Sequence, residues 1–177
     1  TTLSGLDWPR IKATSATKRE QQKQELCQLL DQLKAAKINT VFMQTRIRGA
    51  VIYPSKIDPW DVCLTGQYDK VPGYDPLAFA IEETHKRGME LHAWVVTVPS
   101  FKIKDAAKLG SKSLLKTHPD LLKKHHDMYY LDPGLPGAHD YLVSICKEIV
   151  SRYDVDGFHF DYIRYPENAE VFPDGAT

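Results

Sequence analysis

The sequence lacks several features that would assign it to a specialised class of protein. Its 177 residues include only three cysteines, Cys27, Cys63 and Cys146, and none belongs to a CxxC pair. An odd number without such spacing argues against a disulfide framework. No apolar run approaches the ~20 residues that a membrane helix needs. The first residues show no secretory signal pattern, which is also expected of a processed chain.

An excess of charge of one sign is missing as well. Lysine plus arginine number 23 and aspartate plus glutamate also number 23, so the formal net charge is zero. Without a basic field, there is no reason to expect nucleic acid or an anionic membrane as a partner. A hydrophobic share of 42% and a charged share of 26% are typical of one globular domain, or of part of a larger one.

Hydrophobic periodicity predicts alternating strands and helices. The predicted strands cover the end of segment 1–9, then 38–46, 90–98 and the stretch from 154 to 161. The predicted helices cover 18–37, 75–88 and 138–153. Connections before strands are short, whereas the connections 47–74 and 99–135, which follow strands, are long. Loops that follow strands build the active sites of parallel α/β barrels. The order therefore predicts an α/β protein with a parallel sheet.

Polar side chains recur near the carboxyl ends of three predicted strands. Alternation puts Phe158 and Phe160 against a helix layer and His159 and Asp161 on the opposite face. The same face of the other two strands carries Gln44 with Arg46, and His92 with Trp94. Any one of these could be a satisfied core residue, but their agreement across three strands favours a binding site.

Several segments, in collinear order, resemble a known family. They are I-N-T-V-F-M-Q-T-R from Ile38, Y-P-S-K-I-D-P-W from Tyr53, P-G-Y-D-P-L-A-F-A-I-E-E-T-H-K-R-G-M-E-L-H-A-W from Pro72, L-D-P-G-L-P from Leu131, and the Asp156 strand. Together they resemble the bacterial glycosyl-hydrolase-like family ten, also called the domain of unknown function 187 family. The resemblance implies a (β/α)8 barrel of TIM type that acts on an oligosaccharide or polysaccharide, with no cofactor. It also implies a secreted, periplasmic or lipid-anchored protein of the bacterial envelope.

The last predicted strand is also similar to strand four of the α-amylase clan, whose pattern is G-F-R-x-D. Here the residues read Gly157-Phe158-His159-Phe160-Asp161, so the clan's nucleophilic aspartate corresponds to Asp161 and its arginine to His159. This resemblance implies that Asp161 is the nucleophile or transition-state stabiliser, with His159 beside it. The alternative role for Asp161 is a structural salt bridge with Arg164. Asp156 is expected to have a structural role at the start of the strand.

The remaining candidates are expected to bind substrate. The flat rings of Trp94, Tyr162 and Tyr165 could stack on sugars, and His92 could hydrogen-bond sugar hydroxyls or hold Asp161 ionised. Gln44, Arg46 and Arg164 are expected to contact the substrate with polar groups. Asp7 and Trp8, at the end of the first predicted strand, are expected to complete the floor of the substrate pocket.

A (β/α)8 barrel usually needs about 250 residues, so residues 1–177 are expected to form the amino-terminal part, about four strands. Glycoside hydrolysis normally uses two carboxylates, and the clan's acid comes from strand five. The chain alone is therefore expected to be inactive and to self-associate through open strand edges. One alternative is a non-catalytic glycan-binding or scaffold module. Another is a metal-dependent hydrolase using His92, His159 and Asp161, although no H-x-H or H-E-x-x-H motif is present.

Overall fold

The computed structural model describes residues 6–168, 171 and 172. In chain order, the elements are α1 (Ala16–Ala35), β1 (Thr40–Ile47), β2 (Ala50–Val51), α2 (Val62–Thr65), α3 (Pro76–Lys86), β3 (Glu90–Val96), β4 (Pro99–Lys102), η1 (Ile103–Lys108), α4 (Leu114–Thr117), η2 (Pro119–Leu121), β5 (Leu122–His125), β6 (Met128–Leu131), α5 (Pro136–Arg152) and β7 (Gly157–Asp161).

The main sheet has the strand order β2-β1-β3-β7. β1, β3 and β7 are parallel, whereas β2 is the antiparallel arm of a hairpin on β1. These three parallel strands confirm the mixed α/β prediction, and the three long helices lie where periodicity placed them. The strand expected at the end of segment 1–9 is not found at residues 6–9, and residues 1–5 lie outside the described part of the chain.

Local capping explains where two helices begin. The Ser15 side chain accepts a hydrogen bond from the Lys18 amide at 3.2 Å and starts α1. Asp75 accepts from the Ala78 amide at 3.0 Å, and Pro76 occupies the first turn of α3. Both are side chains that satisfy amides which the first helical turn leaves unpaired. These caps fix where α1 and α3 begin.

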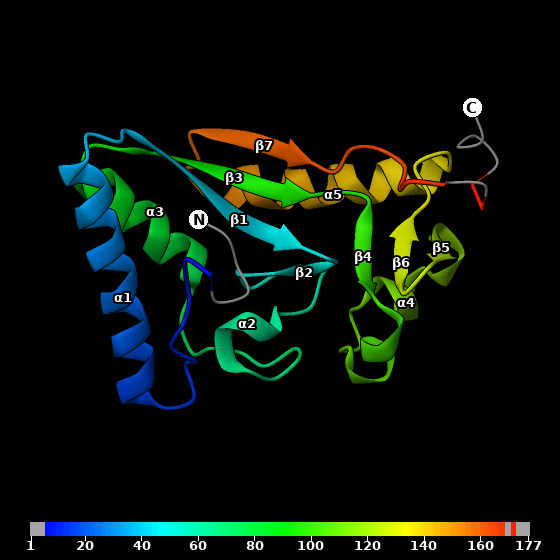
Figure 1. The fold of residues 1–177 in the computed structure, drawn as a ribbon, viewed down its shortest axis with the longest axis horizontal. Helices are drawn as coiled ribbons and strands as arrows, with labels where there is room; N and C mark the ends of the chain where they lie inside the picture. The colour runs from blue at the N-terminus through cyan, green and yellow to red at the C-terminus, as the bar shows by residue number, and fades with distance from the viewer. Residues whose placement is uncertain (1–5, 169–170, 173–177) are drawn as a thin grey trace.

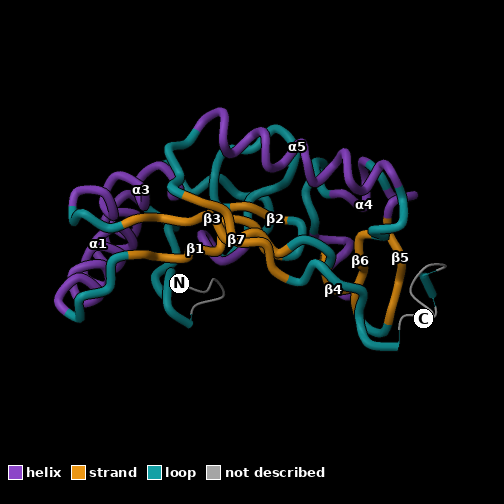
Figure 2. Tube along the Cα trace, turned by 90° about the horizontal axis from the view of Figure 1, so that it is seen from above, coloured by secondary structure: helices purple, strands orange, loops and turns teal. Residues whose placement is uncertain are grey.

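In Figure 2, α5 lies lengthwise over one face of the main sheet, and α1 and α3 lie toward the other end of the strands. Leu91, Ala93 and Val95 on that face of β3 are at most 1% exposed. They share a core with Ile145 and Ile149 of α5. The expectation for Phe160 was wrong: its side chain is 49% exposed and stacks on Phe158, because the helix layer does not extend over the free edge of β7.

A second sheet lies beyond the carboxyl ends of the main strands, with the order β4-β6-β5 (Figure 1). It is built entirely from the connection 99–135, in which no strand was predicted. The Leu131 amide donates to the Val98 carbonyl at 2.8 Å and so attaches this sheet to the segment that leaves β3. The segments L-K-K-H and M-Y-Y-L do not alternate strictly between apolar and polar residues, so periodicity gave no signal for β5 and β6.

Candidate active site at the carboxyl ends of the strands

Asp161 ends β7 and lies beside the end of β3. The strand register pairs it with Val96 and pairs His159 with Trp94. The Trp94 indole Nε1 donates to Asp161 Oδ2 at 3.0 Å, and the Tyr162 amide donates to Asp161 Oδ1 at 2.8 Å. The ring of Trp94 also meets His159 edge-on, with ring centroids 5.7 Å apart. Four predicted site residues therefore form one connected group.

The backbone around Asp161 is also fixed from β3. Thr97 Oγ1 donates to the carbonyl oxygens of Asp161 and Tyr162, at 2.8 and 3.0 Å, and the Thr97 amide donates to Asp161 at 3.0 Å. Immediately after this anchor, Tyr162 adopts a φ of 50°. This left-handed conformation is rare for a residue with a Cβ and costs free energy that the surrounding contacts must supply. The chain therefore turns sharply at the point where Asp161 emerges.

Asp161 forms no ion pair within the described residues, so the predicted alternative of a bridge to Arg164 is not found there. Instead, the Arg164 guanidinium lies 5.6 Å from the centre of the Tyr162 ring, and its Nη1 donates to the Tyr165 carbonyl at 3.4 Å. The carboxylate keeps one indole and one amide donor, which leaves its remaining lone pairs available to a ligand.

His92 shares the face of Asp161 but lies nearer the amino ends of the strands. It pairs with Gly157, the first residue of β7, and its ring meets Phe42 with centroids 5.2 Å apart. Its Nε2 lies 3.5 Å from Glu90 Oε2. A Cβ at Gly157 would be 2.6 Å from the imidazole, so only glycine allows the ring to lie there. His92 therefore packs near the amino ends of β3 and β7. We had expected it at the carboxyl ends, beside Asp161.

A cavity of 540 Å³ opens next to Asp161. Four predicted residues, Gln44, Tyr162, Arg164 and Tyr165, contribute to its wall. A smaller hollow next to it is lined by Phe160, Asp161, Tyr162, Ile163 and Arg164. The predicted convergence of His92, His159, Gln44 and Asp161 on one cavity is therefore only partly found, because only Gln44 lines the larger one. Tyr162 and Arg164 connect the two spaces.

Sequence reasoning missed the wall that the small second sheet contributes. His125, His126, Met128 and Tyr130 all line the 540 Å³ cavity. His125 Nε2 lies 2.7 Å from the Glu167 carbonyl oxygen, and its ring centroid is 4.1 Å from that of His126. The dense run H-H-D-M-Y-Y was the available signal, since such residue types are unusual together in a plain connecting loop. The connection 99–135 lies at the end of the sheet where we expected it.

The connection 47–74 contributes less to the site than expected. Ile47 and Arg48 at its start line the cavity. The rest turns away: the Ala13 amide donates to the Leu64 carbonyl at 2.8 Å, and Ser55 Oγ donates to Glu148 Oε2 at 2.5 Å. Most of this segment therefore packs against the start of α1 and against α5.

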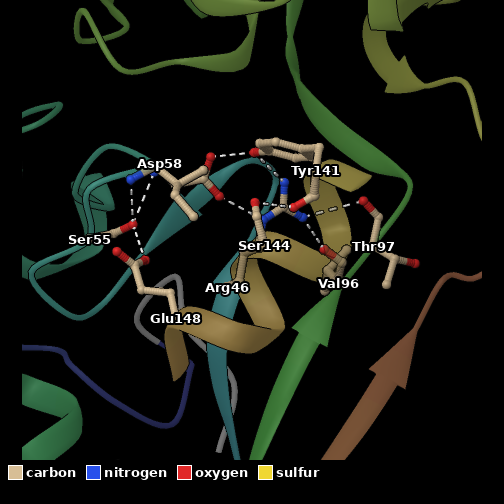
Figure 3. Close-up of polar contacts among 9 residues, drawn as sticks. Arg46, Ser55, Asp58, Val96, Thr97, Tyr141, Ser144 and Glu148 are labelled. Carbon is tan, nitrogen blue, oxygen red and sulfur yellow. Dashed lines mark hydrogen bonds and ion pairs between the residues drawn. The ribbon is translucent and has the colours of Figure 1, made fainter. Parts of the chain in front are cut away.

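Arg46 does not share the face of Gln44, which corrects the prediction from alternation. The register of β1 against β3 shifts between Gln44 and Arg46, so that Arg46 pairs with Val95. A β-bulge at Thr45 sends the next side chain to the opposite face. Arg46 consequently points toward α5 and is completely buried (Figure 3).

The buried guanidinium is fully engaged there. Its Nε donates to Asp58 at 2.8 Å, its Nη1 to the Val96 and Thr97 carbonyls at 2.5 and 3.3 Å, and its Nη2 to Tyr141 at 3.2 Å. Tyr141 also donates to Asp58. Burial and then the charge of Asp58 raise the pKa of Tyr141. Burial opposes the charge on Arg46, but its two neighbours Tyr141 and Asp58 outweigh burial and raise the pKa of the guanidinium. Arg46 thus joins β1 to β3 and has no surface to offer a substrate.

The predicted floor residues Asp7 and Trp8 also lie elsewhere. Trp8 is completely buried in the core, and its Nε1 donates to the Gln22 carbonyl of α1 at 3.0 Å. Asp7 is exposed and lines none of the cavities described above. Both were expected at the end of a strand, which residues 6–9 do not form. Because that strand is absent at residues 6–9, the Trp8 indole is not directed toward the site and instead packs against α1.

Asp156 has the structural surroundings that we expected. Its Oδ2 accepts from the Leu91 amide at 2.7 Å and lies 2.8 Å from His85 Nε2. Burial alone would raise the pKa of Asp156, but the hydrogen bonds from His85 and Leu91 lower it below its ordinary value. Asp156 therefore ties the start of β7 to α3 and β3, at the end of the sheet opposite Asp161.

Two further properties concern the described residues as a whole. They contain no group of three or more histidine, cysteine or carboxylate side chains arranged to hold a metal ion, so the metal-dependent alternative gains no support. None of the helices in this part of the chain combines the length and apolar character that a membrane span requires.

The fold and the site together describe a parallel α/β protein with a carboxylate, aromatic rings and a cavity at the carboxyl ends of its strands. The chain belongs to the family described as Glycosyl hydrolase-like 10, whose model matches residues 1–173. The resemblance noted in the sequence is therefore confirmed.

Two curated relatives carry glycosyl hydrolase names. The chain is 38% identical to "Glycosyl hydrolase DigH" of Escherichia coli K12 over 94% of its own length and 41% of that protein. It is 40% identical to "Glycosyl hydrolase YngK" of Bacillus subtilis over 97% of its own length and 34% of that protein. The chain thus spans less than half of each relative. Among solved structures, it resembles a maltogenic α-amylase, AmyB of Thermotoga neapolitana, at 18% identity. The TM-score is 0.55 over 89% of this chain and 37% of that one, which shows likeness of fold alone.

Proposed function

We propose that residues 1–177 form the amino-terminal part, about four strands, of a (β/α)8 glycoside hydrolase domain. The parallel order of β1, β3 and β7 supports this arrangement, as does the place of β7 at the edge of the described sheet, where the next barrel strand would pair. The glycosyl hydrolase names of two longer relatives support the activity. In this reading, the cavity beside Asp161 is half of an active site, and the remaining strands supply the other half.

The single observation that carries the proposal is the position of Asp161. It lies at the carboxyl end of a parallel strand, where barrel enzymes hold their catalytic groups, and Trp94 orients its carboxylate from 3.0 Å. We assign to it the role of nucleophile or stabiliser of an oxocarbenium-like transition state. The general acid would be a second carboxylate from the rest of the barrel, about 5–10 Å away.

Neighbouring side chains would bind and orient the sugar. His159, exposed beside Trp94, could donate to hydroxyls next to the scissile bond. Trp94, Tyr162 and Tyr165 offer ring faces on which sugars stack. Gln44 and Arg164 line the cavity with polar groups, whereas Arg46 acts through the backbone of β3.

The proposed substrate is a glycan of the bacterial envelope or a dietary polysaccharide, and the proposed location is secreted, periplasmic or lipid-anchored. Both follow from family resemblance. Fractionating cells that express the complete protein would test the location. Recovery of the protein from the cytoplasm alone would contradict it.

The test of function is Asp161→Asn in the complete barrel protein, assayed on bacterial cell-wall glycan and on α-glucan oligosaccharides. The change keeps the shape of the side chain and removes its charge, so turnover should fall by several orders of magnitude while glycan binding persists. Asp154→Asn is the matched control, because Asp154 is exposed and lies before β7. Near-normal turnover by the Asp161 variant would rule out the assignment. Glycan binding without any turnover in the unmodified protein would favour a binding module instead.

A further inference from the structure

A second cavity of 360 Å³ lies beside the first and has no part in the proposed chemistry. Its wall is formed by the β1–β2 hairpin, by the segment 59–69 and by the start of the connection 99–135. Ile47 and Arg48 line both cavities, so the two cavities are neighbours separated by these residues. A ligand that leaves the first cavity over Arg48 would enter the second.

Arg48 occupies an unusual position for an arginine. Ile47 pairs with Ala50, so Arg48 and Gly49 form a two-residue hairpin turn, with φ values of 51° and 71°. Turns with two positive φ values favour Asn-Gly, and a residue with a Cβ costs roughly 1–2 kcal/mol there. Arg48 is nevertheless exposed, and its guanidinium makes no hydrogen bond or ion pair within the described residues. A strained residue with unused donors is typical of a ligand contact.

The lining combines aromatic rings with carboxylates. Trp60, Tyr68 and Phe101 supply the rings. Asp69 Oδ1 accepts from the Trp60 amide at 3.2 Å and fixes that ring's backbone. Asp61 is buried, and its Oδ1 accepts from the Cys63 amide at 2.7 Å. Ring faces beside carboxylate acceptors suit a sugar, which has an apolar face and a rim of hydroxyl donors.

The volume of the second cavity and the charges along its wall limit the classes of ligand that it could bind. Small-molecule cavities span about 300–1,000 Å³, so 360 Å³ is small and fits one or two sugar units better than a peptide or nucleic acid strand. Three cations (Lys12, Arg48, Lys102) and three carboxylates (Asp61, Asp69, Asp105) line it. The lining therefore has no formal net charge with which to select a charged ligand.

We propose that the second cavity is a distal subsite that binds an uncharged sugar unit of the glycan whose cleavage site lies at Asp161. The inference rests on the proposed function and deepens it: the substrate is a chain long enough to pass from one cavity over Arg48 into the other. The protein would accordingly prefer long oligosaccharides to short ones.

The test measures dissociation constants and kcat/KM of the complete protein for one oligosaccharide series of increasing length. The unmodified protein should gain affinity at the length that first reaches the second cavity. Ala50→Phe fills that cavity from β2 and should remove the gain, a loss of about tenfold for long chains, with short chains unaffected. Arg48→Gly suits the turn and should also weaken long chains. Lys37→Gly is the matched control, since Lys37 is an exposed cation with a φ of 61° in the α1–β1 connection.

The outcomes separate the two proposals. If the unmodified protein binds and cleaves no oligosaccharide, the proposed function fails and the subsite with it. If it cleaves glycans but both variants keep the full gain with length, the subsite is overturned and the function stands. Equal losses for short and long chains would also overturn it, because a distal subsite acts on long chains only. Circular dichroism checks folding, and Arg48→Gly suffices if Ala50→Phe does not fold.

Discussion

Thr97 Oγ1 lies 2.8 Å from the carbonyl oxygen of Asp161 and donates a hydrogen bond to it. On the other side, the Thr97 carbonyl accepts from Arg46 Nη1, which is held by the buried carboxylate of Asp58. A continuous series of polar contacts therefore runs from behind the sheet to the candidate nucleophile (Figure 3 shows its buried part). The position of Asp161 depends on side chains that never reach the cavity.

Thr97→Val should lower kcat on a verified glycan substrate by about tenfold with little change in KM. Valine keeps the shape of threonine and removes two hydrogen bonds, each worth about 1 kcal/mol. Thr97→Ser keeps the hydroxyl and should restore most of the turnover. Steady-state kinetics of both variants decide the point. Equal turnover in Val and Ser variants would show that the hydroxyl does not position Asp161.

Arg46→Met should destabilise the protein by about 3–5 kcal/mol, because it leaves the charge of Asp58 buried without a partner. Both side chains of the pair are completely buried. Replacing Arg46 and Asp58 together by methionine and leucine should cost much less than the sum of the single changes. Urea unfolding of the four proteins gives this double-mutant cycle. Additive losses would mean that the two groups do not interact.

Gly157→Ala should cost about 1–3 kcal/mol, the usual range for overpacking. The new methyl would lie 2.6 Å from the His92 ring. His92→Ala, combined with it, removes the ring and should recover part of the loss. Thermal unfolding of the single and double variants measures this. No rescue would locate the strain in the backbone of β7 instead.

Asp156→Asn should lower the thermal stability at neutral pH, with a difference that shrinks as the pH falls. The contacts to His85 and Leu91 hold the pKa of Asp156 below its unfolded-state value, even though burial acts the other way. A lowered pKa contributes stability above the unfolded-state pKa of about 3.9, and this is lost as the pH falls through the folded-state value.

Melting temperatures of the Asp156→Asn and unmodified proteins between pH 7 and pH 3 test this. Asp154→Asn, at an exposed position two residues earlier, serves as the control. A difference that is constant with pH would show that the charge of Asp156 has no part in the effect.

The chain alone should self-associate and show little glycosidase activity. β7 pairs only with β3 within the described residues, and Phe160 on this edge strand is 49% exposed. Unpaired edges and apolar surface both promote association. Light scattering should show dimers or larger species, and Phe160→Lys should reduce them. A monomer at millimolar concentration would contradict the prediction.

The sequence by itself determined the three long helices, the three parallel strands between and after them, the family and the faces of His92, Trp94, His159 and Asp161. These follow from periodicity, from capping residues and from motifs read along the chain. Alternation holds wherever a strand is regular, and for this reason the start of β3 at Glu90 and the end of β7 at Asp161 were placed correctly.

Only the tertiary structure decided the face of Arg46, the burial of Trp8 and the strands within the connection 99–135. A bulge at Thr45 reverses the face of Arg46, whose guanidinium then binds Asp58 in the following connection and Tyr141 on α5. Trp8 is buried by contact with α1, and the four-residue strands β5 and β6 exist only through pairing with each other and with β4. Local pattern specifies regular elements, whereas packing between distant segments decides where a strand departs from regularity.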